Sequence, residues 1–345
     1  MIEAGPTAAV STARSSPLSP PADCSFAEPD WRILAGLWHP VAFLADIPAD
    51  RPLGVRLLDV DLVVYRSGDA IVVADDACPH RGAALTPGRL ADGCLRCPYH
   101  GRRFGATGTS EDGWRLRAYP TRTGHDLLWV CLAGEPPFEL PAWPELTQTQ
   151  GVRQMRLPPL EWNCSVSRQV ENFQDVAHLS WLHTGTFGNR ARPEIAAYQL
   201  EERPHGFHFD CRYPRKSVEA HGPDLGTVED LVLSYDLHLP FISRLVINFP
   251  DGTHYQIYNL PAPVSRQRCR IFIRMLRDFD LDGSDQPTID LQLAVLEEDR
   301  PMVESQRPEE IPLDLTEEFH IGADRLSAAY RRALRSMGLG HPLSS

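Results

Sequence analysis

The sequence predicts an α+β fold, in which a small all-β domain precedes a larger domain with a central antiparallel sheet and helices. Three features support this prediction. Short apolar runs broken by turns fill residues 31–140, a proline-rich segment occupies residues 135–146, and β-like runs lie between two helical stretches further on. With 345 residues, the chain is long enough for two domains that each bury a core.

Composition narrows the classes of function. The chain is 42% hydrophobic and 23% charged, which is typical of a soluble globular protein. Its formal net charge of −12 argues against nucleic acid as a partner, because phosphate binding needs a basic surface. No apolar run approaches the roughly 20 residues of a membrane span, so no membrane association is expected.

The N-terminal segment, residues 1–30, is rich in Pro, Ser and Ala, and it predicts a disordered lead. It lacks the basic and apolar regions of a signal peptide, so we expect a cytoplasmic protein with reduced thiols. The eight cysteines include five isolated ones, which we interpret as ordinary thiols: Cys24, Cys131, Cys164, Cys211 and Cys269.

The first domain is expected over residues 31–140. The runs at 55–66 and 70–77 flank the turn Ser-Gly-Asp and predict a hairpin, and residues 126–134 form another β-rich run. Between these runs lie two fragments, CPHRG at 78–82 and CPYHG at 97–101, which proline and glycine place on loops.

The second domain is expected over residues 147–345. A helix is predicted at 167–183, and helical periodicity returns at 292–306 and 315–338. The strand-like runs between them are 207–213, 230–241, 244–249, 254–260 and 268–276.

The two loop fragments each pair one cysteine with one histidine: Cys78-x-His80 and Cys97-x-x-His100. Two cysteines and two histidines can hold a single zinc ion, and Cys94 would offer a further thiolate. Zinc sites, however, usually combine one Cys pair with one His pair rather than two mixed arms. A two-iron cluster needs the mixed set, because two Cys hold one iron and two His hold the other.

A second candidate metal site lies in residues 171–183. His178 and His183 could supply the two imidazoles of a facial triad of non-haem iron, which also needs one carboxylate. Residues five apart point about 140° apart on a regular helix. The helix must therefore end or form a π-type bulge between the two histidines if they bind one ion.

Both motifs resemble one known family. CPHRG, a sixteen-residue gap after His80, and CPYHG resemble Rieske proteins, while Asn-x-x-Asp-x-x-His-x4-His resembles the catalytic motif of Rieske non-haem iron oxygenases. The resemblance implies a helix-grip-like catalytic domain and a homotrimer. It also implies a [2Fe-2S] cluster on Cys78, His80, Cys97 and His100, iron on His178 and His183, an Asp175 that links the two centres, and an Asn172 near the iron.

The third iron ligand is also expected from the resemblance. Residues 297–306, EEDRPMVESQ, resemble the methylxanthine N-demethylase branch, which points to Asp299, with Glu298 and Glu297 as alternatives. The same short-chain group includes vanillate and dicamba O-demethylases.

The resemblance implies a terminal oxygenase that hydroxylates or demethylates a small ring compound with O2. Electrons would come from NAD(P)H through a separate ferredoxin or flavin reductase, because the chain has no G-x-G-x-x-G motif. Two alternatives remain: a ring cis-dihydroxylating dioxygenase, and an electron-transfer protein without active mononuclear iron. Four arginines near the loops are either a docking surface for an acidic ferredoxin or solvated charges: Arg81, Arg96, Arg102 and Arg103.

Overall fold

The computed structural model describes residues 19–134, 136–218 and 224–343. The chain divides into two units, one containing Trp31–Leu140 with the residues up to Cys24, the other Pro141–Ser345 with Ser25–Asp30. Residues 1–18 of the expected disordered lead lie outside the described residues. The rest of that lead is not all irregular, because helix α1 (Glu28–Ala35) begins before residue 31. None of the described helices has the length and apolar character of a membrane span.

The first unit is built from three-stranded antiparallel sheets. The hairpin predicted from the Ser-Gly-Asp turn is confirmed, since β3 pairs with β4 from Leu62 opposite Asp75 to Ser67 opposite Ala70, but the first part of the predicted run 55–66 forms a separate strand, β2. The sheets, in strand order, are β2 (Leu53–Leu57), β3 (Val60–Ser67) and β4 (Ala70–Asp75); β1 (His39–Phe43), β9 (Leu127–Val130) and β8 (Thr121–Gly124); and β5 (Arg89–Ala91), β6 (Cys94–Arg96) and β7 (Arg103–Phe104).

The second unit contains one large antiparallel sheet of eight strands, of which the strand-like runs predicted five. The predicted runs correspond to β13 to β17, although the runs 230–241 and 244–249 extend beyond the ends of β14 and β15. In order along the sheet the strands are β10 (Arg153–Arg156), β17 (Arg268–Arg277), β16 (His254–Ser265), β15 (Ile242–Asn248), β14 (Asp224–His238), β13 (Gly206–Val218) and β12 (Glu201–Arg203), with β11 (Leu160–Trp162) also paired to β17.

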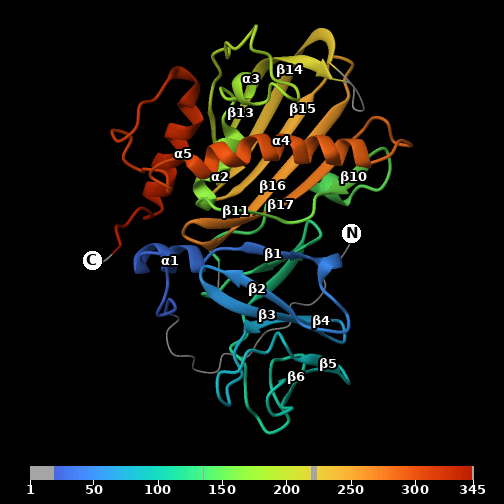
Figure 1. Cartoon of the computed structure of the whole chain (residues 1–345), viewed down its shortest axis with the longest axis vertical. Helices are drawn as coiled ribbons and strands as arrows, with labels where there is room; N and C mark the ends of the chain where they lie inside the picture. Colours follow the sequence, from blue (N-terminus) through green and yellow to red (C-terminus); the bar gives the residue numbers. More distant parts are fainter. Residues whose placement is uncertain (1–18, 135, 219–223, 344–345) are drawn as a thin grey trace. The chain divides into compact units, whose positions relative to one another are not determined.

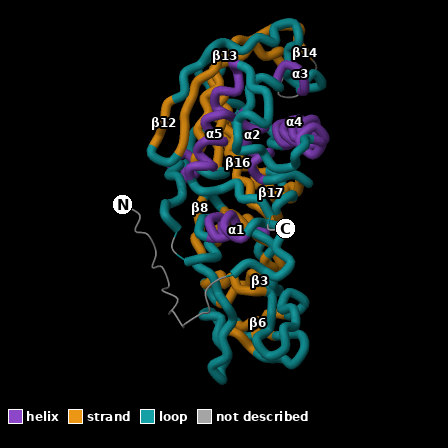
Figure 2. The backbone as a smooth tube through the Cα atoms, turned by 90° about the vertical axis from the view of Figure 1, so that its left-hand side faces the viewer, coloured by secondary structure: helices purple, strands orange, loops and turns teal. Residues whose placement is uncertain are grey.

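Two helices, α2 (Val166–Gln174) and α4 (Gln286–Ser305), lie on one face of this sheet (Figures 1 and 2). Amide side chains attach α2 to the sheet. Gln169 and Asn259 exchange two hydrogen bonds of 3.0 Å, and Gln174 Nε2 donates to Ser243 Oγ at 2.8 Å. These buried polar contacts fix the helix in register on the strands, because an unpaired buried amide would be costly.

The helix expected at 167–183 is shorter than predicted. It ends at Gln174, Asp175 is extended at φ −74° and ψ 125°, and a one-turn helix α3 (Leu179–Leu182) follows. Similarly, the helix expected at 315–338 is α5 (Arg325–Ser336), preceded by a 3-10 turn. The interruption after α2 places polar side chains at the end of the helix, where the first of the functional residues lie.

Candidate metal centres

The two Cys/His loops of the first unit repeat one backbone arrangement. The N–H of Cys78 donates to the carbonyl of Ala83 at 2.8 Å, and the N–H of Gly82 donates back to Cys78 at 2.8 Å. In the second loop, the N–H of Cys97 donates to the carbonyl of Arg102 at 2.8 Å, and the N–H of Gly101 donates to the carbonyl of Cys97 at 3.0 Å.

The last glycine of each loop has a left-handed backbone, with φ of 68° at Gly82 and 72° at Gly101. A side chain there would be strained, so glycine closes both turns.

The cysteines and histidines of these loops face different environments. Cys78 and Cys97 are buried in an apolar cluster that includes Tyr65 and Phe104. Burial, together with the neighbouring Cys97 thiol, raises the pKa of the Cys78 thiol. The two imidazoles are exposed and adjacent, and their Nδ1 atoms lie 3.2 Å apart. The loops thus present two sulfurs inward and two ring nitrogens outward.

This separation fits a two-iron cluster better than a single zinc ion. A single zinc ion would need ligand atoms that meet at one point. Among the described residues, the His, Cys, Asp and Glu side chains whose ligand atoms lie within 4.8 Å of one another belong to the second unit, not to these loops. Cys94, the extra thiol that zinc could have used, instead accepts a weak contact of 3.9 Å from Arg103 Nη2. The donor set of two thiols and two imidazoles, arranged in pairs, matches the requirement of a Rieske cluster.

Side chains outside the two motifs support the loops. Asp76 accepts hydrogen bonds from the N–H groups of Leu85 and Thr86 at 2.6 and 2.8 Å, and from Thr86 Oγ1 at 2.7 Å. Trp114 lies on a third loop with its ring centroid 5.6 Å from that of His80. The guanidinium of Arg102 covers the same indole at 3.7 Å. Sequence reasoning missed Asp76 and Trp114, because only their position in space marks them.

The arginines near the cluster loops are mostly paired with acidic side chains. Arg96 contacts Asp92 at 2.6 Å, Arg102 contacts Asp112, and Arg103 lies 3.6 Å from a carboxylate oxygen of Glu111. Their charges are therefore largely balanced locally. Among the described residues no ion pair is found for Arg81, which is exposed.

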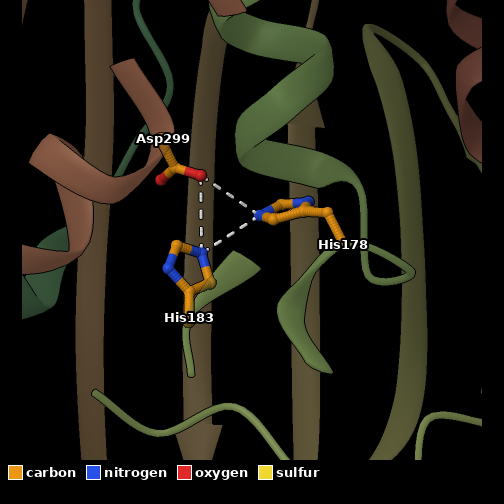
Figure 3. A group of neighbouring side chains, drawn as sticks. All are labelled: His178, His183 and Asp299. Atoms are coloured by element: carbon orange, nitrogen blue, oxygen red, sulfur yellow. Dashed lines mark hydrogen bonds and ion pairs between the residues drawn. The ribbon is translucent and has the colours of Figure 1, made fainter. Parts of the chain in front are cut away.

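In the second unit, the break after α2 brings the two motif histidines together. His178 precedes helix α3 and His183 follows it, where the backbone leaves helical geometry at φ −85° and ψ 35°. Their Nε2 atoms lie 3.2 Å apart. Asp299, on α4, completes a triangle, since its Oδ1 lies 3.4 Å from each Nε2 atom (Figure 3).

The triangle has the dimensions of a metal site. Two ligand atoms each about 2.1 Å from one ion, at right angles, lie about 3 Å apart. Among the described residues, this group of ligand atoms converges within 4.8 Å. Two imidazoles and one carboxylate on one side of an ion form the set used by non-haem Fe(II) oxygenases, so these three residues fit the iron.

Carboxylates and an amide surround the triangle. Asp175 Oδ2 lies 3.1 Å from His178 Nδ1, and Glu298 Oε2 lies 2.9 Å from His183 Nδ1. Asn172 Nδ2 donates to Asp299 Oδ1 at 3.1 Å. Each histidine can therefore donate its Nδ1–H to a carboxylate and keep its Nε2 lone pair for a metal, as ligating histidines usually do.

The two alternatives to Asp299 are thus placed elsewhere. Glu298 lies on the Nδ1 side of His183, away from the point where the Nε2 atoms meet. Glu297 forms an ion pair with Arg300 at 3.6 Å, and 61% of its side chain is exposed.

The electrostatics of the site favour a cation. Burial lowers the pKa of His178, but the Asp175 and Asp299 carboxylates outweigh this effect and raise it to about 10. Burial raises the pKa of Asp175, whereas the hydrogen bond with His178 lowers it, and the net direction is downward. Burial lowers the pKa of His183. A cation between these groups would replace the proton that the carboxylates attract to His178.

A buried ion-pair network holds the C-terminal half of α2. Arg331, on α5, contacts both carboxylate oxygens of Glu171 at 2.7 and 2.8 Å, and also Glu318 at 2.7 Å. Arg168 contacts Glu318 at 2.7 Å and Glu171 at 3.5 Å. Because these charges are paired on both sides, the network fixes the turn of α2 that carries Asn172.

A cavity of about 570 Å³ adjoins this network and reaches the metal-site motif. Asp175 and His178 line it, together with the exposed side chains Trp181, Met302 and Phe319. The cavity therefore gives the Asp175–His178 pair access to the surface.

Comparison with known proteins assigns both regions. Residues 37–121 match the model of the Rieske [2Fe-2S] domain, and residues 162–339 match that of the vanillate O-demethylase oxygenase C-terminal domain. Methylxanthine N1-demethylase NdmA of Pseudomonas putida is 27% identical over 89% of this chain and 90% of that protein. The dicamba O-demethylase oxygenase component of Stenotrophomonas maltophilia is 30% identical over 48% of this chain and 50% of that protein.

Solved structures agree. Pseudomonas putida CBB5 NdmA with caffeine superposes with a TM-score of 0.77 at 26% identity, covering 89% of this chain and 92% of that one. Dicamba monooxygenase bound to dicamba shares the fold, with a TM-score of 0.76 at 20% identity over 88% of this chain and 97% of that one.

Proposed function

Because this chain belongs to the Rieske oxygenases, as an α-subunit with a C-terminal domain of the vanillate O-demethylase type, we propose that it removes an N- or O-methyl group from a small ring compound. The observation that carries the proposal is the intact His178, His183 and Asp299 triangle in the same chain as a Rieske domain. The relatives named above, N- and O-demethylases, favour methyl groups as the target.

The proposed roles follow from the geometry. Cys78, Cys97, His80 and His100 would hold the [2Fe-2S] cluster, and the triangle would hold one Fe(II). The cluster would supply electron transfer and the Fe(II) would supply O2 activation. In the overall reaction the substrate methyl group, O2, two electrons and two protons give the demethylated product, formaldehyde and water.

The protein's own polar groups would prepare the second centre for this reaction. Asp175 would orient His178 and connect it to the cavity, while Asn172 would restrain the carboxylate of Asp299 through its amide. The electrons would come from NAD(P)H through a ferredoxin or flavin reductase.

A homotrimer is proposed as the working assembly, in which the cluster of one subunit serves the iron of its neighbour. The cavity beside Asp175 supports this, because its exposed Trp181, Met302 and Phe319 offer an apolar surface next to the expected electron entry. Light scattering of the purified protein tests the assembly: a mass of one chain would contradict it.

Turnover with a surrogate reductase tests the function. The purified protein, with about three irons per chain, is supplied with NADH, O2 and a panel of N-methylated heterocycles and methoxylated aromatic acids. We expect formaldehyde in equal amount to a demethylated product for at least one substrate. Ring diols or hydroxylated rings without formaldehyde from any member would contradict demethylation and favour the other oxygenase reactions.

A further inference from the structure

One turn of α4 contacts both nitrogen atoms of a single imidazole. Asp299 approaches His183 at Nε2, with Oδ1 at 3.4 Å, and the preceding residue, Glu298, approaches it at Nδ1, with Oε2 at 2.9 Å. Glu298 was expected only as an alternative metal ligand. Its position on the opposite side of the ring excludes that role in this geometry and suggests another.

Both carboxylate oxygens of Glu298 are already occupied by donors. Oε2 accepts from His183 Nδ1 and from Thr186 Oγ1 at 2.9 Å, and Oε1 accepts from the N–H of Gly185 at 3.1 Å. A carboxylate that accepts three hydrogen bonds is held in one orientation. Glu298 therefore joins α4 to the segment 183–188 and to the ring of His183.

The segment 183–188 is shaped for this contact. A Cβ atom on Gly185 would lie 2.6 Å from Glu298 Oε1, so only glycine permits the approach. The N–H of Gly188 donates to the carbonyl of His183 at 2.7 Å, and the Phe187 ring stacks on the imidazole with centroids 4.9 Å apart. The ring of His183 is consequently fixed by stacking on one side and by Glu298 at its edge.

We infer that Glu298 is a positioning residue of the mononuclear site: it holds His183 with Nδ1 protonated and Nε2 directed at the metal. The inference rests on the proposed function, because it assumes that the triangle binds iron. Asp175 makes the corresponding contact with His178 but also lines the cavity, whereas Glu298 is not among the cavity residues. The contribution of Glu298 is thus to metal binding, separate from any electron path through Asp175.

Metal affinity, rather than turnover alone, tests the inference. The mononuclear metal is removed from the holoprotein by a chelator while cluster absorbance is monitored, and Co(II) is then bound by equilibrium dialysis and counted by elemental analysis. Cobalt accepts the same nitrogen and oxygen ligands and is distinguished from cluster iron. Cluster absorbance per chain and the melting temperature report folding in every variant.

Four proteins are compared. Glu298→Gln should weaken Co(II) binding by roughly 10- to 100-fold, the usual effect of changing a residue that supports a ligand. Glu297→Gln, its exposed neighbour, should match the wild type. Thr186→Val removes the Oγ1 contacts with Glu298 Oε2 and with the His183 carbonyl but leaves the Glu298–His183 Nδ1 contact in place, so it should weaken binding less than Glu298→Gln.

The outcomes separate the two proposals. Wild-type affinity in Glu298→Gln would overturn the inference, and so would an equal loss in Thr186→Val, which would make Glu298 a simple tether of the segment. A wild-type protein that binds no Co(II) at this site would instead overturn the proposed function.

Discussion

The two proposed metal centres are encoded differently in the chain. The residues proposed to hold the cluster fall within residues 78–100, on two loops that repeat the same hydrogen bonds around Cys78 and Cys97. The residues proposed to hold the mononuclear iron come from a broken helix and from α4, and they meet only because both elements pack on one face of a large sheet. Local turns build the first centre, whereas tertiary structure builds the second.

This difference has a consequence for stability. A centre made by two tight turns depends on a few nearby residues, such as the glycines with φ near 70°. A centre made by distant elements depends on contacts that hold those elements, such as the Arg331–Glu171 pair and the Glu298–His183 hydrogen bond. Variants of single residues should therefore affect one centre and leave the other intact.

The largest effect is expected for Asp299→Ala. Removing one of three ligands should abolish mononuclear iron and product formation, with a loss beyond the roughly 100-fold typical of supporting residues. Iron should fall from about three to about two per chain, with unchanged cluster absorbance. Asp290→Ala, an exposed residue on the same helix, is the control. Loss of the cluster in Asp299→Ala would show that the two centres are not independent.

Asp175→Asn should come next. The amide keeps the size of the side chain but loses the charge beside His178, so both metals should remain while cluster oxidation slows by about 10- to 100-fold. Stopped-flow absorbance of the reduced cluster, mixed with O2 and substrate, measures the rate. Glu297→Gln serves again as a control for loss of one negative charge. An unchanged oxidation rate would remove Asp175 from the electron path.

The same contrast explains what could be predicted from sequence. The hairpin of β3 and β4 and the strands of the large sheet were within reach, because each depends on short-range pattern, whereas the pairing of His178 with His183 at one site was expected only from the resemblance to the Rieske oxygenases. The geometric requirement predicted a helix end or bulge between His178 and His183, but α2 ends at Gln174, before both histidines.

The role of Glu298 could not be read from the chain. Glu297, Glu298 and Asp299 on α4 are chemically alike. Only packing places Glu297 toward solvent, Glu298 beside His183 Nδ1, and Asp299 beside the Nε2 atoms of both histidines. The one available signal was Gly185, because a glycine shortly after a metal-binding histidine allows a close approach.

Gly185→Ala sharpens the comparison by disturbing the second centre without changing any polar group. The new methyl group would meet Glu298 Oε1, the far end of a long side chain, so the fold should tolerate it while Glu298 moves from His183. We expect Co(II) affinity to fall by about tenfold, near the lower limit for supporting residues. Gly322→Ala, which meets no atom within 4 Å, is the matched control. Equal affinities in the two variants would contradict the positioning role of Glu298.

The smallest effect is expected in the first centre, for Asp76→Asn. Asp76 receives three hydrogen bonds from Leu85 and Thr86, and one amide oxygen can replace only part of them. The lost hydrogen bonding should cost about 1 kcal/mol of local stability, the usual net contribution of one hydrogen bond, and cluster release on heating should quicken several-fold. Asp69→Asn, an exposed residue in the turn between β3 and β4, is the control. Because the turns around Cys78 and Cys97 retain their own backbone hydrogen bonds, the cluster should still assemble fully at low temperature. An Asp76→Asn protein that never acquires the cluster would mean that the loop depends on distant support as much as the mononuclear site does.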